Sequence, residues 1–374
     1  MFSPFALALL TTTAGLVAAQ GGQTCNATTA CPSSAPCCSE FGFCGTGSQF
    51  CLGGCNPLWS HSPTSCEPNP ICKDGTYTFP DSSLSSILSN VTLYNGNASA
   101  HDFVLEKGNI FNTNQNGGEL VLTLTEANGG TRISSTRYVH YGTITALIRT
   151  SKWAGVVTAF ITMSDVKDEI DWEWPGTQVT EAQTNYFWLG HADYSAGHGT
   201  TVKDLNDTYV NYHNYTIDWQ EQELNWFIDG KVVRTLKKAD TLSNGRYEYP
   251  STPSRVQLSL WPAGINTSAP GTIEWAGGMI NWQDPDYIAA GQFSAIVKEV
   301  SVKCAPLTGV TNASAMTSYT YSGNDSTGVP AVQVTNQSTL LGGAIPGVSV
   351  GHSFWFGLGA GMLCAVAGVF STVL

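Results

Sequence analysis

Residues 168–174 read Asp168-Glu169-Ile170-Asp171-Trp172-Glu173-Trp174. Successive side chains of a β-strand point to opposite faces, so the last three acids of this stretch share one face and its apolar residues share the other. Three acids in a row on one face repel each other, which folding stability alone does not favour. The large apolar face nonetheless indicates a strand that is anchored in a core. The row of acids is therefore a candidate for chemistry.

Two of these acids suit glycoside chemistry. Glu169 and Glu173 lie about 13 Å apart at Cα on a regular strand, and their side chains can lean toward each other. Retaining glycosidases hold two carboxyl groups about 5–5.5 Å apart, one as the nucleophile and the other as the acid/base. Asp171 lies between them, where it can hydrogen-bond one Glu and help to separate their protonation states. Spacing alone leaves two other interpretations open, a solvated acidic stripe and a hard-cation site, although calcium usually recruits further oxygen ligands from a loop.

The sequence around this stretch predicts an all-β fold. Short runs that alternate apolar and polar residues recur, and Gly, Asn and Asp punctuate them as turns require. Asp229-Gly230 lies between two such runs and is a strong hairpin signal. No long amphipathic helical pattern competes, so we predict a two-sheet β-jelly-roll sandwich over residues 72–304. Its runs include Leu120 to Thr125, Thr143 to Arg149, Val156 to Thr162, Asn185 to Leu189, Tyr215 to Trp219 and Arg255 to Trp261.

Cysteines set a small N-terminal module apart from this domain. Of the eleven cysteines, ten remain when Cys364 in the apolar C-terminal tail is set aside, and an even number in a secreted chain predicts disulfides. Six of them crowd into residues 25–51, a stretch with too few aliphatic residues to build a core, so disulfides must hold it. Cys72 and Cys304 bracket the β domain, and we predict that they pair with each other.

Both ends of the chain have the composition of processing signals. Residues 1–19 contain an apolar stretch rich in Ala, Leu and Thr, which predicts a secretory signal peptide. Residues 344–374 contain a short spacer and an apolar tail that follow small residues, the ingredients of a GPI-attachment signal. A membrane-spanning anchor is the alternative at either end. We expect a secreted protein that is GPI-anchored at the plasma membrane or cell wall, and nine Asn-X-Ser/Thr sequons fit that compartment.

Two segments of low apolar content connect the predicted domains and the C-terminal tail. Residues 56–71 are rich in Pro and Ser and predict a linker, with Cys55 and Cys66 as its own pair. Residues 305–343 lose the alternation and become rich in Ser, Thr, Asn and Gly, which predicts a flexible, glycosylated stalk.

The formal charge of −12, with only 16 Lys and Arg, argues against nucleic acid or an anionic membrane surface as partner. A neutral polymer is the better expectation, and we expect a monomer that meets the membrane only through its GPI anchor.

Aromatic residues on a polar strand face are candidates for sugar stacking. Within Arg255 to Trp261 the even-numbered positions are apolar, whereas Gln257 and Trp261 share the polar face. An exposed Trp on such a face is unexpected in a simple core strand, so we predict that both residues line a cleft. Thr272 and Trp275, in the Gly-rich loop that follows, are expected to close the same cleft.

The acidic stretch resembles the Glu-x-Asp-x-Glu signature of glycoside hydrolase family 16, a β-jelly-roll family of retaining enzymes. Further segments resemble the strands of that family in the expected order, among them Tyr141-Gly142-Thr143, the run from Trp153 to Phe160, and the run from His213 to Trp219. The resemblance covers about Cys72 to Cys304.

This resemblance implies roles for individual residues. Glu169 would be the nucleophile, Asp171 its helper and Glu173 the proton donor and acid/base. Gln183 and Asn185 lie in a segment that resembles a substrate-contacting strand of the family.

The cysteine spacing over residues 23–55 resembles the hevein-type chitin-binding module. That family pairs Cys25 with Cys38, Cys31 with Cys44, and Cys37 with Cys51. Its N-acetylglucosamine contacts would fall on Ser39 and on the rings of Phe41, Phe43 and Phe50. The chain departs from the family in carrying Phe where Trp or Tyr is commoner, which gives less stacking area. A disulfide-stapled cap without a ligand is the alternative.

Together these features resemble the fungal Crh-type cell-wall transglycosylases. The resemblance implies an enzyme that cleaves chitin by a retaining mechanism and transfers the chain to β-glucan or chitin, with endochitinase as a further activity. One alternative is a hydrolytic β-glucanase or chitinase, and another is a non-catalytic chitin-binding adhesin. No organic cofactor is implied, and the histidines show no metal-like cluster.

Overall fold

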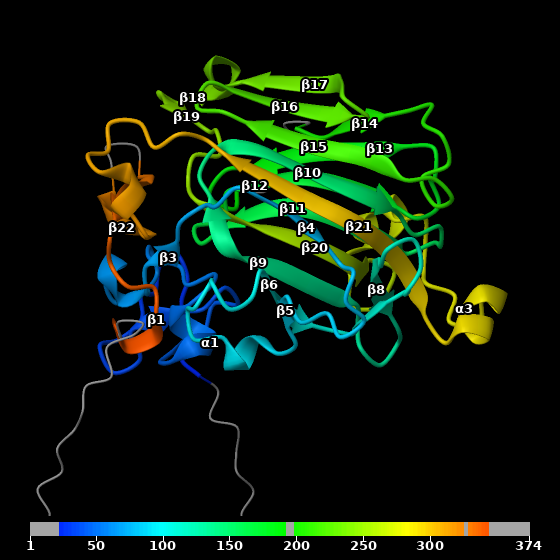
Figure 1. The fold of residues 1–374 in the computed structure, drawn as a ribbon, viewed down its shortest axis with the longest axis horizontal. Helices are drawn as coiled ribbons and strands as arrows, with labels where there is room; N and C mark the ends of the chain where they lie inside the picture. Colours follow the sequence, from blue (N-terminus) through cyan, green and yellow to red (C-terminus); the bar gives the residue numbers. More distant parts are fainter. Residues whose placement is uncertain (1–21, 192–197, 325–327, 344–374) are drawn as a thin grey trace, which may run out of the picture. The chain divides into compact units, whose positions relative to one another are not determined.

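A computed structural model describes residues 22–191, 198–324 and 328–343 of the chain (Figure 1). The predicted signal peptide over residues 1–19 and the predicted GPI signal over residues 344–374 lie outside these ranges. Within the described ranges, every helix is too short or too polar to cross a membrane.

Two eight-stranded sheets form most of the described chain, as the sequence predicts. The β12 sheet has the order β14-β13-β12-β11-β20-β9-β6-β5, and the β10 sheet has the order β17-β16-β15-β10-β21-β8-β7 with β4 also paired to β21. The strands of the β12 sheet are β5 (Ile87–Leu88), β6 (Phe103–Lys107), β9 (Thr131–Val139), β11 (Val156–Ser164), β12 (Glu169–Pro175), β13 (Ala182–Phe187), β14 (Thr200–Val202) and β20 (Ser254–Pro262). The strands of the β10 sheet are β4 (Gly75–Thr78), β7 (Ile110–Asn112), β8 (Leu120–Leu124), β10 (Gly142–Arg149), β15 (His213–Trp219), β16 (Glu223–Ile228), β17 (Lys231–Lys237) and β21 (Phe293–Cys304).

Helical segments are short. The α-helices are α1 (Ser48–Cys51), α2 (Pro270–Trp275) and α3 (Pro285–Ala290). The 3-10 turns include η1 (Pro63–Ser65), η2 (Val91–Leu93), η4 (Lys238–Thr241), η5 (Ala313–Ala315) and η6 (Leu341–Gly343). The predicted hairpin joins β16 to β17, where Asp229 (φ 49°) and Gly230 (φ 76°) both adopt the left-handed conformation of a type I′ turn.

The core lies between the two sheets. The apolar face of β12 is fully buried there, and the rings of Trp172 and Trp174 lie 5.3 Å and 4.4 Å from that of Tyr215 on β15. Trp172 Nε1 donates to the backbone carbonyl of Thr216 at 3.3 Å, so its polar atom is satisfied inside the core. The alternation predicted for residues 168–174 is therefore confirmed.

The N-terminal module is built on disulfides. The three pairs implied by the hevein resemblance are present, and so are Cys55–Cys66 and Cys72–Cys304. Beside α1 the module contains the short strands β1 (Cys37–Cys38) and β2 (Cys44–Gly45). The predicted linker over residues 56–71 has the Cys55–Cys66 bond expected for it, and it also contains η1 and the strand β3 (Asn69–Pro70), which its composition did not indicate.

The prediction of a flexible stalk over residues 305–343 is wrong for residues 318–324 and 330–335. Strands β22 (Ser318–Asn324) and β23 (Pro330–Thr335) form a three-stranded sheet with β3. The Ser- and Thr-rich composition conceals alternating aromatic and β-branched residues, and the side chains of Tyr319 and Tyr321 are buried. Farther along, the Leu341 N–H donates to the carbonyl of Asn95.

Asp168 fixes the start of β12 and is fully buried. Its Oδ2 accepts from the N–H of Ser251, the N–H of Thr252 and the Thr252 hydroxyl at 2.9, 3.1 and 2.7 Å, while Oδ1 accepts from the N–H of Leu189 at 2.9 Å. This carboxylate therefore joins β12 to two loops.

Replacement of this carboxylate should destabilise the fold. We expect Asp168→Asn to lower the free energy of unfolding by about 2 kcal/mol, because one amide N–H₂ must face backbone donors in the buried site. Urea denaturation measures the change. Asp240→Asn, the same substitution at an exposed position, should change stability by less than about 0.5 kcal/mol, and equal effects of the two variants would contradict the assignment.

Candidate active site

The β12 sheet carries the three acids on the face turned away from the core, here called the acid face. On the neighbouring strand β13, Glu169, Asp171 and Glu173 are paired with Phe187, Asn185 and Gln183. On β11 their partners are Met163, Ile161 and Ala159. Directly paired residues share a face. The structure therefore brings Gln183 and Asn185, predicted as substrate contacts, beside the acids.

The acids differ in exposure and in hydrogen bonding. Glu169 and Glu173 are half-buried, whereas Asp171 is only 2% exposed. Among the residues that the structure describes, none donates a hydrogen bond to Asp171 Oδ1, while a side-chain hydrogen bond joins Asp171 to Glu169. Two carboxyl groups form such a bond only if one of them holds a proton, so Asp171 and Glu169 share one.

The environment raises the pKa of all three acids. Burial raises the pKa of Glu169 to about 7, against the opposing effects of the Asp171 hydrogen bond and the Lys167 charge. Burial and then the charge of Glu169 raise the pKa of Glu173 to about 8, while a hydrogen bond from Trp261 opposes the shift. Burial and the two neighbouring glutamates hold the pKa of Asp171 well above its ordinary range. The surroundings therefore favour the ionised form at Glu169 more than at Glu173 or Asp171.

Two tryptophans organise the far end of the acid face. Trp261, at the end of β20, hydrogen-bonds Glu173, and its ring stacks on Trp275 with centroids 5.9 Å apart and planes at 25°. Trp275 Nε1 in turn donates to Gln183 Oε1 at 2.8 Å. The structure therefore joins three of the predicted contact residues to Glu173. Thr272 and Trp275 lie in the helix α2 rather than in the loop predicted for them, because Pro270 starts a helical turn.

Gln257 provides an unused donor on the same face. It lies opposite Ile161, which in turn lies opposite Asp171, so Gln257 is two strands from the middle acid. The residue is 2% exposed, and its Nε2 has no hydrogen-bond partner within residues 22–191, 198–324 and 328–343. A buried amide without a partner is costly, which is the property expected of a group that a ligand satisfies.

Sequence reasoning did not single out Lys167, Glu40 or Arg132. Lys167 lies in the turn before β12 with φ 71°, and burial lowers its pKa while its charge acts on Glu169. Glu40 belongs to the N-terminal module, and nothing in the sequence near it indicates a contact with the β12 sheet. Arg132 lies among strand residues with no acidic residue next to it in the sequence, so its ion pairs could not be predicted.

The predicted contacts of the N-terminal module differ in accessibility. Phe41 and Phe43 are 69% and 46% exposed. Phe50 is half-buried, with its ring over Gly45. Ser39 is 5% exposed and its hydroxyl accepts from the N–H of Phe43 at 3.3 Å, so in this structure Ser39 holds the module's own backbone.

Comparison with known proteins agrees with this arrangement. The family model "Glycosyl hydrolases family 16" matches residues 97–277. Crh-like protein 2 of Aspergillus fumigatus is 44% identical over 326 residues, which are 85% of this chain and 70% of that relative. Congo red hypersensitive protein 2 of Saccharomyces cerevisiae is 42% identical over 321 residues, which are 85% of this chain and 67% of that relative.

A solved structure gives the same result for the fold. The structure described as "Crh5 transglycosylase in complex with NAG" superposes with a TM-score of 0.55 at 30% identity, covering 69% of this chain and 92% of that one. With an acid-bearing β-sandwich and relatives of this identity and coverage, the chain belongs to the Crh-like proteins of glycosyl hydrolase family 16.

Proposed function

We propose that this protein is a cell-wall transglycosylase that cleaves chitin with retention and transfers the new chain end to β-glucan or to chitin. The observation that carries the proposal is the pair Glu169 and Glu173 on one strand face, with Glu169 the more readily ionised of the two. A retaining mechanism needs one ionised and one protonated carboxyl group. The shared proton of Asp171 favours the charged form of Glu169.

The reaction proceeds in two displacements. In the first, a carboxylate oxygen of Glu169 forms a bond to the anomeric carbon, the glycosidic C–O bond breaks, and the proton of Glu173 passes to the leaving oxygen. In the second, Glu173 takes the proton of an acceptor hydroxyl, whose oxygen bonds to the anomeric carbon as the ester to Glu169 breaks. A sugar hydroxyl as acceptor gives transfer, and water gives hydrolysis.

Transfer is the outcome that the relatives favour. The solved neighbour carries the name transglycosylase and was determined with NAG, the monomer of chitin. We place the sugar on the acid face, with Gln257 as a donor, Gln183 and Asn185 beside the acids, and the rings of Trp261 and Trp275 as stacking surfaces near Thr272.

The remaining assignments concern the modules and the location. We assign chitin binding to the module over residues 23–55, through Phe41, Phe43 and Phe50, with Ser39 supporting their backbone. We assign the protein to the cell surface as a monomer, delivered by a signal peptide and held by a GPI anchor at the wall or plasma membrane.

Loss of the nucleophile should abolish transfer. We expect Glu169→Gln to lower the formation of labelled adducts by roughly 10³-fold or more, because no glycosyl-enzyme can form. The measurement incubates the secreted protein with chitin oligosaccharides and a fluorescent β-glucan oligosaccharide, and separates the products by size. Glu126→Gln, at an exposed position, should retain wild-type turnover.

The alternatives predict different products in the same assay. Shortened chitin fragments without labelled adducts would replace transfer by hydrolysis. Absence of turnover in the wild type as well would support the non-catalytic adhesin.

The hydrogen bond from Trp261 should be visible in the pH profile. Trp261→Phe keeps a stacking ring but removes the N–H that stabilises ionised Glu173, so the pKa of this acid should rise. The acid must be protonated to act, and the alkaline limb of kcat against pH should therefore move to higher pH. Trp275→Phe removes only the bond to Gln183 and should leave that limb in place. An unmoved limb in Trp261→Phe, or a shift to lower pH, would disprove this role.

A further inference from the structure

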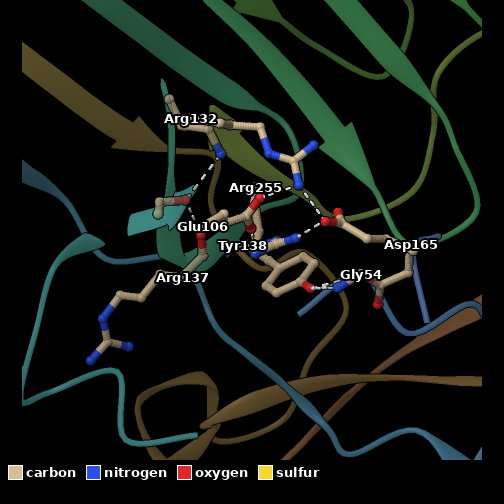
Figure 2. Close-up of polar contacts among 10 residues, drawn as sticks. Gly54, Glu106, Arg132, Arg137, Tyr138, Asp165 and Arg255 are labelled. Carbon is tan, nitrogen blue, oxygen red and sulfur yellow. Dashed lines mark hydrogen bonds and ion pairs between the residues drawn. The ribbon is translucent and has the colours of Figure 1, made fainter. Parts of the chain in front are cut away.

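The N-terminal module is held on the acid face by ion pairs. Glu40 of the module forms ion pairs with Arg132 on β9 and, at 3.5 Å, with Arg255 on β20. Arg255 also pairs with Glu106 on β6 at 2.6 Å, and Arg132 pairs with the same Glu106 (Figure 2). Arg255 shares its strand face with Gln257, so Glu40 reaches residues of the acid face itself. The side chains of Arg255 and Glu106 are only 4% and 6% exposed, as expected of a closed interface.

Backbone contacts leave little room for movement at this interface. The N–H of Gly54 donates to Tyr138 Oη at 3.1 Å and to Asp165 Oδ1 at 3.0 Å, and Tyr138 itself donates to Asp165 at 2.7 Å (Figure 2). A Cβ at Gly54 would come within 2.8 Å of Glu40 Cβ, and one at Gly53 within 2.8 Å of Arg255 Nη1. The module is therefore seated closely on β9 and β20.

This seating places an exposed ring on the acid face. The guanidinium carbon of Arg132 lies 5.8 Å from the ring centre of Phe41, which is 69% exposed. Arg132 is paired with Ser259, Ser259 with Ala159, and Ala159 with Glu173, so one row of paired residues crosses the sheet from Phe41 to the acid/base. Three strand spacings separate Arg132 from Glu173, or about 14 Å between their backbones.

We propose that Phe41 forms a distal sugar-stacking site of the catalytic face, and that Glu40 fixes the N-terminal module there as a wall of the substrate site. The inference rests on the proposed function, because it assigns a further contact for the same polysaccharide. A neutral β-linked sugar chain suits this surface, since its C–H faces stack on Phe41 and its hydroxyls can accept from Arg132. A chain that spans the row then contacts the module and the acids at the same time.

The test compares donors of different length. In the Glu169→Gln background, which binds without turnover, affinities for chitin oligosaccharides from the disaccharide to the octasaccharide are measured by calorimetry. Phe41→Ala should weaken binding by about tenfold only above a threshold length and leave the short members unchanged. Phe111→Ala, which removes a 43% exposed ring on β7 of the other sheet, should change neither.

A second variant separates the ring from its placement. Glu40→Gln retains Phe41 but removes the charge that holds the module to Arg132 and Arg255, so it should give the same length-dependent loss. Thermal unfolding of each variant checks that the chain is folded. Equal losses for short and long oligosaccharides, or no loss, would show that the module is an independent anchor and overturn the proposal.

The distal site and catalysis can be tested independently of each other. Binding is measured in a protein that needs no turnover, so length dependence can appear even if the wild type transfers nothing. Conversely, transfer by the wild type without any effect of Phe41→Ala would overturn the distal site alone.

Discussion

Trp172 and Trp174 are fully buried against Tyr215, and because side chains alternate along β12, their burial determines the direction of the three acids. A shift of the strand by one residue would expose both indoles and place three carboxyl groups in the core. Each buried ion would then cost several kcal/mol. The register of β12 is therefore strongly specified, and the hydrogen bonds to Asp168 fix the residue at which the strand begins.

The same register creates the electrostatic problem that the site exploits. Three carboxyl groups on one half-buried face cannot all be charged, so the protein retains protons on some of them. Differences in the surroundings of the three carboxyl groups decide which of them keep a proton. Glu169 has the Asp171 hydrogen bond and the charge of Lys167 in its favour, whereas the charge of Glu169 itself disfavours ionisation of Glu173. Folding thus gives two chemically identical side chains different tendencies to ionise, as the proposed mechanism requires.

The alternation of apolar and polar residues was sufficient to predict this strand and the β-sandwich. A strand that is buried on one face has an apolar residue at every second position, and this pattern is visible in the sequence. It also placed Gln257 and Trp261 on the acid face, which the pairing of β20 with β11 confirms. Composition was a poorer guide for the strand at residues 318–324, within the predicted stalk. There Tyr319 and Tyr321 become buried only because β22 pairs with β3, a partner about 250 residues earlier in the chain.

Contacts between distant segments explain the other omissions. Glu40 and Arg132 are 92 positions apart, and the residues adjacent to each of them in the sequence do not indicate that the two form an ion pair. Arg255 was readable as a charged residue on a polar strand face, yet its burial depends on Glu106 and on the glycines of the N-terminal module. A composition of disulfides and small polar residues predicted a self-contained module. It contained no information about the surface on which the module rests.

That surface changes how the two parts of the chain should be understood. A module on a free linker raises the local concentration of its polymer but leaves the orientation of the chain open. Here the Cys55–Cys66 bond shortens the connection, β3 pairs with β22, and Glu40 reaches the acid face. With these restraints acting together, the orientation of the module is set by the same packing that sets the acids. On our proposal, sugar binding at the module and chemistry at Glu169 then take place on one continuous surface.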